Sequence, residues 1–372
     1  MSIKFGAASL AFALSTSTAL AGGFERSGLP VGFMFEKGNY GELSLGHVTP
    51  KVEGATNVGS VASGNIAGSY RTVGVAFKSD LNEKLSLGIT IDPSYGADVS
   101  YGTGTSYPVR GSSAKLRGET IALLGRYKLN DKLSVVAGVR SVGIGGNVSL
   151  STTTITGFGG ALANFYNASF RHTRDIGYLF GAAYEKPEIA LRVGLTYASS
   201  TKHTLPVTGS VLVAPPTLTP FTDTTDVELP QSLTLDFQSG VAADTLVFGS
   251  VRWVDWTATT LIGPNAGAAN PLTEHDNDSI TYNIGVGRKF SDQFSGAISI
   301  GYEKSNGGIA GNLSPTDGYK SIQVGGTYTM GNMKISGGVR YVDVGDALAL
   351  SGASNFTGNS AIGVGVKVGF TF

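Results

Sequence analysis

Apolar and polar side chains alternate along most of this chain with the period of two that a β-strand requires. In residues 362–372 every second side chain is a large apolar group, from Ile362 to Phe372, and glycine, lysine or threonine stands between them. The same division recurs at 85–92, 189–197, 232–238 and 280–287. One apolar and one polar face per segment is typical of strands that turn lipid-facing groups outward and line a polar lumen.

Short polar turns alternate with longer loops between these segments. The turns lie at 79–84, 130–132, 185–188, 241–244, 291–293 and 331–333, and the loops lie near 52–70, 102–110, 151–167, 206–226, 259–277, 306–318 and 345–358. Bacterial outer-membrane barrels have an even number of strands and short periplasmic turns. The sequence therefore predicts an all-β fold, a transmembrane antiparallel up-and-down β-barrel of about 14 strands.

The N-terminus has the features of a secretory signal peptide. Lys4 precedes an apolar run over 5–14 and the small-residue pattern Ala19-Leu20-Ala21, and such a run is too short to cross a bilayer as a helix. We expect cleavage after Ala21. The chain then divides into a signal peptide at 1–21, a short N-terminal hatch-like segment at 22–39 and the barrel at 40–372.

Composition narrows the class of protein. Glycine makes up 54 of 372 residues, cysteine is absent and the formal net charge is zero, so that nothing indicates disulfides or binding of nucleic acid. The four histidines show no spacing that would bind a metal, and no cofactor is implied. A soluble β-sandwich also hides one face of each strand and is the alternative to a barrel, but it does not explain the secretion signal together with the regular turns.

Several inward positions of the predicted strands are basic. The alternation places Arg126, Arg140, Arg192 and Arg252 in the lumen, with Leu246 and Phe248 on the inward face below Arg252. These residues either form the salt-bridged interior that any barrel has or contact an anionic amphiphile such as a fatty acid.

Two of the long loops are unusually apolar for exposed connections. They contain Phe158, Leu162, Phe165, Tyr166 and Phe170 in or just after 151–167, and Val211, Leu212, Val213, Leu218 and Phe221 in 206–226. Exposed apolar clusters commonly mark binding sites, although these loops could also pack on one another as a lid.

A proline interrupts the third predicted strand. Asp92-Pro93 breaks an alternation that continues through Tyr95 and Ala97, with Gly96 between them. Since proline donates no hydrogen bond to a ladder, we expect a kink or bulge here.

Taken in order, these features resemble the FadL/TodX family of outer-membrane transporters for long-chain fatty acids and other hydrophobic compounds. The resemblance covers the expected mature chain. It rests on the glycine- and phenylalanine-containing start at 22–28, Phe35-Glu36-Lys37-Gly38-Asn39-Tyr40, the segment 91–97, Glu228-Leu229-Pro230 and Arg252-Trp253-Val254-Asp255-Trp256.

The resemblance implies passive uptake of a hydrophobic small molecule, such as a long-chain fatty acid, across the bacterial outer membrane. Residues 22–39 would be the hatch, the two apolar loops would capture the ligand, and Asp92, Pro93, Tyr95, Gly96 and Ala97 would form a lateral opening into outer-membrane lipid. The C-terminal Phe370 and Phe372 resemble the signal that the barrel-assembly machinery recognises. No enzymatic activity is implied.

The N-terminal segment departs from the family pattern. It is shorter than the family's hatch and lacks the Asn-Pro-Ala motif. A general or anion-selective diffusion porin is therefore the alternative function.

Overall fold

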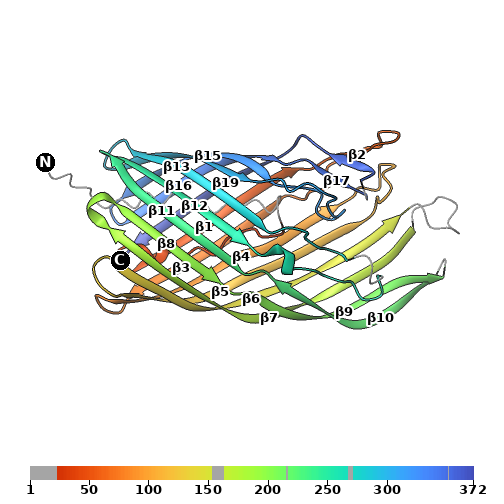
Figure 1. The fold of residues 1–372 in the computed structure, drawn as a ribbon, viewed down its shortest axis with the longest axis horizontal. Coiled ribbons are helices and arrows are strands. Elements are labelled where there is room, and N and C mark those ends of the chain that lie inside the picture. Colours follow the sequence, from red (N-terminus) through yellow and green to blue (C-terminus); the bar gives the residue numbers. More distant parts are fainter. Residues whose placement is uncertain (1–22, 153–162, 215–216, 267–270, 351) are drawn as a thin grey trace.

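The computed structural model describes residues 23–152, 163–214, 217–266, 271–350 and 352–372. In these residues, fourteen strands form one closed antiparallel barrel (Figure 1). They are β1 (Tyr40–Lys51), β3 (Tyr70–Asp80), β4 (Leu85–Ser100), β5 (Ser113–Lys128), β6 (Leu133–Thr152), β7 (Ala163–Lys186), β8 (Leu191–Ala198), β11 (Ser232–Ala242), β12 (Thr245–Val254), β13 (Ser279–Lys289), β14 (Phe294–Glu303), β15 (Tyr319–Met330), β16 (Met333–Val344) and β19 (Asn359–Thr371).

Each of these strands pairs with the barrel strand before and after it in the chain, and β1 pairs with β19 to close the ring. Closure leaves few backbone N–H and C=O groups unpaired, which hydrocarbon surroundings require. The predicted up-and-down barrel of about 14 strands is confirmed.

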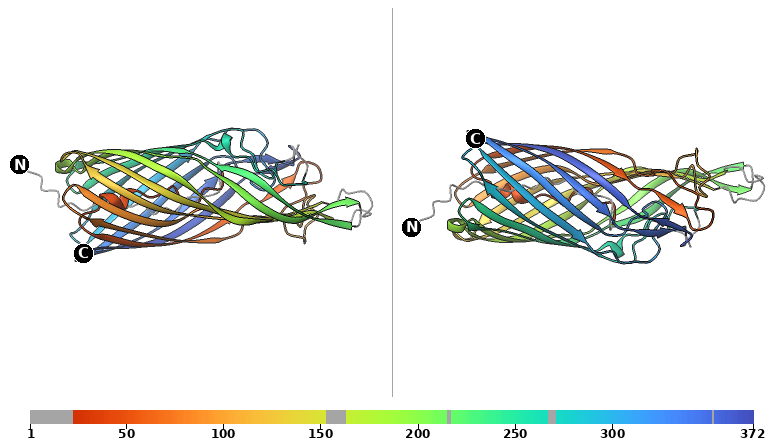
Figure 2. Two further views of the ribbon diagram at one scale, coloured as in Figure 1. Left: turned by 90° about the horizontal axis from the view of Figure 1, so that it is seen from below. Right: turned by 90° about the horizontal axis from the view of Figure 1, so that it is seen from above.

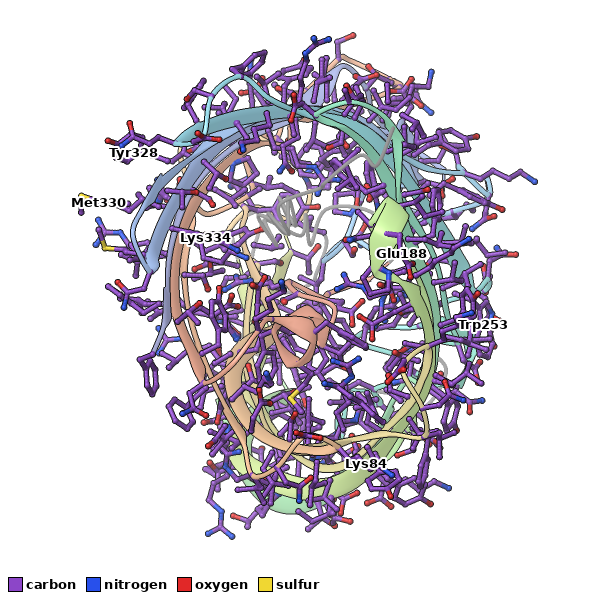
Figure 3. The ribbon with its side chains drawn as sticks, turned by 90° about the vertical axis from the view of Figure 1, so that its left-hand side faces the viewer. Lys84, Glu188, Trp253, Tyr328, Met330 and Lys334 are labelled. Atoms are coloured by element: carbon purple, nitrogen blue, oxygen red, sulfur yellow. The ribbon has the colours of Figure 1, made fainter. Side chains whose placement is uncertain are left out.

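The remaining elements lie inside the barrel or at its ends. They are the 3₁₀ turns η1 (Gly32–Phe35), η2 (Pro187–Ile189) and η3 (Trp256–Ala258), the short strands β2 (Gly54–Thr56), β17 (Ala347–Ala349) and β18 (Ser354–Phe356), and the hairpin strands β9 (Thr201–Ala214) and β10 (Thr217–Leu229). Viewed along the barrel axis, η1 lies within the ring of strands, and Tyr328 and Met330 lie outside it (Figure 3).

The alternation of side chains is preserved across the barrel wall. On β13, Ile280, Tyr282, Ile284 and Val286 are all exposed on the outer surface. On β19, Lys367 faces the lumen and lies 3.5 Å from Glu42, whereas Phe370 is exposed outside. An apolar outer surface and a charged interior are what a lipid-embedded barrel requires.

The short turns and the long loops lie at opposite ends of the barrel (Figure 1), as expected from the sequence. The short turns and the C-terminus lie at one end, and the long connections lie at the other (Figure 1). Short turns face the periplasm in bacterial barrels, so we refer to the opposite end as extracellular. No helix in the described ranges is long and apolar enough to cross a membrane.

The segment 206–226, expected to be a loop, is a β-hairpin instead. β9 pairs with β10 from Thr201↔Leu229 to Ala214↔Thr217. β9 also pairs with β7 over Val207–Val211. The hairpin extends the β6–β7 side of the barrel well beyond the other strands (Figure 2). Pro220 is compatible with this hairpin because β10 lies at the edge of the sheet, where proline is tolerated.

The neighbouring expected loop is also shorter than its predicted span of 151–167. β6 runs to Thr152 and β7 begins at Ala163, so that Phe165 and Tyr166 lie on a strand. Phe158 and Leu162 lie outside the described residues.

Loops cover part of the extracellular end on the other side of the barrel. β2, β17 and β18 form a three-stranded sheet there. The rings of Tyr101 and Tyr107 stack beneath it at 5.4 Å, and Phe356 meets Tyr107 edge-on at 6.4 Å. Together with Val48 of β1 and Ala361 of β19, these residues form one buried apolar cluster.

Candidate functional site

The barrel wall is interrupted between β3 and β4. The two strands pair only from Asp80↔Ser86 to Val75↔Ile91, although β3 begins at Tyr70. The pairing of β4 with β5 also shifts register between Asp92 and Tyr95, on either side of Pro93. The predicted bulge at Asp92-Pro93 is therefore confirmed, and above it the β3-facing edge of β4 lacks its neighbour.

The N-terminal segment takes the place of β3 along this edge. Arg26 N–H donates to the carbonyl of Ser94 at 2.7 Å, and Gly96 N–H donates to the carbonyl of Phe24 at 2.8 Å. Glu25 and Tyr95 thereby form an isolated antiparallel bridge. Higher up, Gly68 N–H donates to Asp98 and Ser100 N–H to Ile66, so that the wall closes again.

Two charged side chains hold the segment in place. Glu25 accepts hydrogen bonds from Arg252 Nη2 at 2.6 Å and from Arg252 Nε at 3.2 Å, on the far side of the lumen. The guanidinium of Arg26 lies in the gap itself, 4.0 Å from the ring centroid of Tyr70. It packs against Gly96 so closely that a Cβ at Gly96 would collide with it.

The segment continues through the lumen to the periplasmic end. The ring of Phe35 in η1 packs against two guanidinium groups, with Arg126 Cζ at 4.2 Å and Arg192 Cζ at 4.7 Å from its centroid. Phe33 and Met34 are buried against Ala122, Leu124 and Val136. Such cation–π and apolar contacts fix a chain segment that has no strand of its own.

The exit from η1 is anchored by lysines of the barrel wall. Lys78 Nζ donates to the carbonyl oxygens of Glu36 at 2.6 Å and Gly38 at 2.8 Å. Lys334 lies 3.3 Å from the carboxylate of Glu36. Residues 24–38 therefore contact the wall on several sides of the lumen, from the gap down to the periplasmic end.

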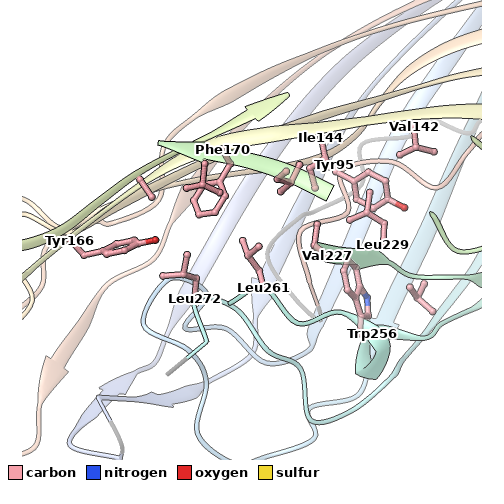
Figure 4. Packing of buried hydrophobic residues seen from close by; sticks show 14 residues of the cluster. Tyr95, Val142, Ile144, Tyr166, Phe170, Val227, Leu229, Trp256, Leu261 and Leu272 are labelled. Carbon is pink, nitrogen blue, oxygen red and sulfur yellow. The ribbon is translucent and has the colours of Figure 1, made fainter. Parts of the chain in front are cut away.

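A cavity of ≈ 230 Å³ lies above the N-terminal segment, towards the extracellular loops. Its apolar lining includes Phe24, Ile144, Phe170, Leu261 and Leu272, and Gly96 and Ala97 of the kinked strand form part of its wall. Figure 4 shows the apolar cluster that surrounds it, to which β4, β6, β7, β10 and the loops after β12 contribute. A smaller cavity of ≈ 40 Å³ is lined by Asp92 and Pro93 together with Ser27.

Phe24 links this cavity to the gap. Its ring meets Trp256 edge-on at 5.0 Å and Tyr95 at 6.0 Å, and it lies 6.2 Å from the ring of His275. Burial lowers the pKa of His275 to about 4, despite the nearby carboxylate of Asp276, which raises it. His275 is therefore a neutral part of the aromatic group at neutral pH.

The six lumen residues expected from the sequence lie away from this cavity and make other contacts. Arg126 and Arg192 hold Phe35, Arg252 binds Glu25, and Arg140 donates to the carbonyl of Ser199. Leu246 is buried and Phe248 is partly buried over Gly285. None of the six lines the cavity of ≈ 230 Å³, and their contact with a ligand stays a prediction.

The loop residues expected to capture a ligand also divide into groups. Phe170 lines the cavity, and Phe165, Tyr166, Val211 and Phe221 belong to the apolar cluster around it. Val213 and Leu218 are exposed near the tip of the hairpin, and Leu212 is partly buried beside them.

Sequence reasoning did not select several residues at the centre of the site. The sequence places Phe24, Glu25 and Arg26 in the expected hatch at 22–39 without indicating their individual contacts, and Trp256, Leu261, Leu272 and His275 are not predicted as site residues. Glu25 and Arg252 are 227 positions apart, so that only the folded barrel brings them together.

Comparison with known proteins is consistent with this architecture. The sequence model of the family described as outer membrane protein transport protein (OMPP1/FadL/TodX) matches residues 38–295, which is more than half of the chain. No curated protein matches the sequence.

Three solved structures share the fold at low sequence identity. A FadL homologue of Pseudomonas aeruginosa aligns with a TM-score of 0.74 at 14% identity, covering 96% of this chain and 98% of its own. The Pseudomonas putida toluene transporter TodX gives 0.68 at 15%, covering 91% of each chain. The Ralstonia pickettii toluene transporter TbuX gives 0.62 at 18%, covering 91% and 90%. The chain belongs to the OMPP1/FadL/TodX family and is an outer-membrane transport protein, not an enzyme.

Proposed function

We propose that this protein carries long-chain fatty acids or other hydrophobic compounds passively across the outer membrane and releases them sideways through the gap between β3 and β4. The observation that carries the proposal is the interrupted ladder above Val75↔Ile91, whose first part, at Ser94 and Gly96, is filled by residues 24–27 and not by a barrel strand. A gap in a lipid-embedded wall that a separate segment covers is a route by which an apolar molecule could reach hydrocarbon without entering water.

Capture would begin at the hairpin and end in the cavity. The exposed Val213 and Leu218 offer an apolar surface outside the barrel, and Phe170 lies further in, on the cavity wall. Two structural neighbours are named as toluene transporters, which agrees with an apolar ligand. Apolar lining with a few polar groups is the usual composition of a small-molecule site.

Release requires the N-terminal segment to shift. The contacts to be broken are the hydrogen bonds of residues 24–27 with Ser94 and Gly96 and the ion pair of Glu25 with Arg252. A backbone hydrogen bond contributes only about 0.5–1.5 kcal/mol net, so the segment can leave the edge of β4 while the barrel stays intact. Phe24 forms the boundary between the cavity and the gap, and its ring would move with the segment.

A disulfide that pins the segment tests this proposal. Glu25 and Tyr95 form a non-hydrogen-bonded antiparallel pair, whose Cα atoms are typically about 4.5 Å apart, within the range of a disulfide. The chain has no cysteine of its own. We expect Glu25→Cys/Tyr95→Cys to take up radiolabelled oleate and toluene at least tenfold more slowly when oxidised than when reduced.

The control uses the second bridge along the same strand. Ala67 and Val99 have the same pairing geometry just above the gap, so Ala67→Cys/Val99→Cys places a disulfide nearby without tying the N-terminal segment. Its uptake should not depend on reduction. Equal uptake by the oxidised and reduced forms of the Glu25→Cys/Tyr95→Cys variant, with the cross-link verified by mass spectrometry, would refute release through the gap.

A further inference from the structure

A β-bulge in β7 places two consecutive basic residues on the outer surface of the barrel. The pairing of β6 with β7 passes from Ile144↔Thr173 to Gly146↔Phe170, so that Arg171 and His172 both lie opposite the single residue Gly145. Both side chains are exposed, whereas regular alternation would turn one of them inward. Bulges commonly re-aim side chains in this way.

Glycines of β6 form the floor of a basic trough between β5 and β7. Arg117 of β5 lies opposite Gly145, and Arg174 of β7 lies opposite Gly143. A Cβ at Gly143 would collide with the ring of His172, so the imidazole covers this glycine directly. The trough is thus bounded by Arg117 on one side and by Arg171, His172 and Arg174 on the other.

The positive charge of the trough is only partly neutralised. Glu119 forms an ion pair with Arg174, and its carboxylate lies 3.2 Å from His172 Nε2. Arg117 and Arg171, both exposed, have no hydrogen-bond or ion-pair partner among the residues that the structure describes. Two guanidinium groups therefore remain available to an anion.

The trough lies at the upper border of the apolar outer surface. Immediately below it on β7, Ile176, Tyr178 and Phe180 are each more than half exposed, and Leu123 on β5 is 54% exposed. Such side chains require lipid chains as neighbours. Arg174 lies two residues above Ile176, and His172 and Arg171 follow it, so the basic groups begin at the level of lipid headgroups, where arginine side chains are commonly found.

We propose that this trough, formed by Arg117, Arg171, His172 and Arg174 over Gly143 and Gly145, binds a phosphate group of a lipid headgroup in the outer leaflet. Guanidinium groups bind phosphate through paired, charge-assisted hydrogen bonds. The opposite part of the rim differs in charge, because acidic residues lie at the ends of β10, β12 and β13, namely Asp226, Glu228, Asp255 and Asp278. The site is separate from the transported molecule and does not depend on its identity.

The test measures retention of lipopolysaccharide by the purified full-length barrel in detergent, using native mass spectrometry. We expect wild-type protein to retain lipopolysaccharide. Its affinity for enzymatically dephosphorylated lipopolysaccharide should be lower by a factor of about ten or more. Arg117→Gln/Arg171→Gln should show a similar loss with the phosphorylated lipid. Inorganic phosphate at millimolar concentration should not displace the lipid, because it lacks the acyl chains that would contact Ile176 and Tyr178.

Lys304→Gln/Lys320→Gln is the matched control, since it removes the same number of exposed positive charges from the rim at β14 and β15. It should retain lipopolysaccharide like the wild type. Unchanged retention by Arg117→Gln/Arg171→Gln, equal loss in the lysine control, equal binding of the dephosphorylated lipid, or displacement by inorganic phosphate would each overturn the proposal. Heat-modifiable migration in electrophoresis verifies that every variant is folded.

Discussion

Glu25 and Arg252 form a two-point ion pair across the lumen, with Arg252 Nη2 2.6 Å from Oε1 and Arg252 Nε 3.2 Å from Oε2 of Glu25. Both side chains are largely shielded from solvent. Arg252 also donates to Thr234 at 2.8 Å, which fixes the guanidinium on the wall independently of Glu25. The wall therefore presents a prepared site to which the N-terminal segment binds.

Removing one partner of this pair should loosen the segment. Loss of one member of a shielded ion pair typically costs about 3–5 kcal/mol, because the other charge is left uncompensated. We expect Glu25→Gln to raise the ion conductance of the protein in planar bilayers at least several-fold above a low wild-type value.

The control for this measurement is Glu83→Gln, which removes an exposed carboxylate from the β3–β4 turn. It should conduct like the wild type. A large, steady wild-type conductance that Glu25→Gln leaves unchanged would show that the N-terminal segment does not block the lumen and would favour a diffusion porin.

A glycine on β4 provides an uncharged route to the same outcome. A Cβ at Gly88 would overlap the sulfur of Met34 and the ring of Phe33, both buried in the N-terminal segment. Gly88→Val should therefore expel η1 from its site and raise conductance, because overpacking a filled site typically costs about 1–3 kcal/mol.

Gly125→Val is the matched control for Gly88→Val. A Cβ added at Gly125 of β5 would lie 3.7 Å from its nearest neighbour, the side chain of Leu87, so that a larger residue is accommodated there. If both variants conduct alike, the packing of Met34 on Gly88 does not hold the segment.

The sequence predicted the barrel well because alternation and turn length are local properties. Ile362 to Phe372 show their two faces without knowledge of any partner strand, and Asp92-Pro93 indicates a break because proline cannot donate a hydrogen bond. The segment 206–226 is predicted as a loop, but most of it forms β9 and β10, and Pro220 lies on the edge strand β10, where proline is tolerated. The partners of Glu25 and Phe35 were beyond reach, because their contacts join segments far apart in the chain.

Acidification should weaken the packing of the loop that carries Trp256 and His275 against Phe24. The pKa of His275 is lowered by burial to about 4, below its ordinary value of 6.5. Between these two values the released loop binds a proton that the packed loop does not, so the packed form is fully favoured above pH 6.5 and weakens as the pH falls towards 4. The free energy that favours the packed form should fall by at most about 1.4 kcal/mol per pH unit.

Fluorescence of Trp256 can follow this change, since the chain has only two tryptophans. In a Trp253→Phe background, acrylamide quenching of Trp256 should increase between pH 7 and pH 4.5. The additional change His275→Gln should abolish the pH dependence. Should the quenching curve be the same with and without His275, another group causes it.

The hairpin tip provides the last test, which separates capture from passage. Val213 is 71% exposed and Leu218 is 37% exposed, and both lie outside the cavity lining. If they collect an apolar ligand from solution, Val213→Ser/Leu218→Ser should slow uptake a few-fold at low ligand concentration, since each loses apolar contact area of modest extent. Uptake at saturating ligand should stay unchanged, because Phe24 and the gap are untouched.

Val58→Ser, which replaces an 88% exposed valine on another extracellular loop, should have no effect at either concentration. A uniform reduction at all ligand concentrations in the hairpin variant would instead assign Val213 and Leu218 to the folding or the gating of the barrel.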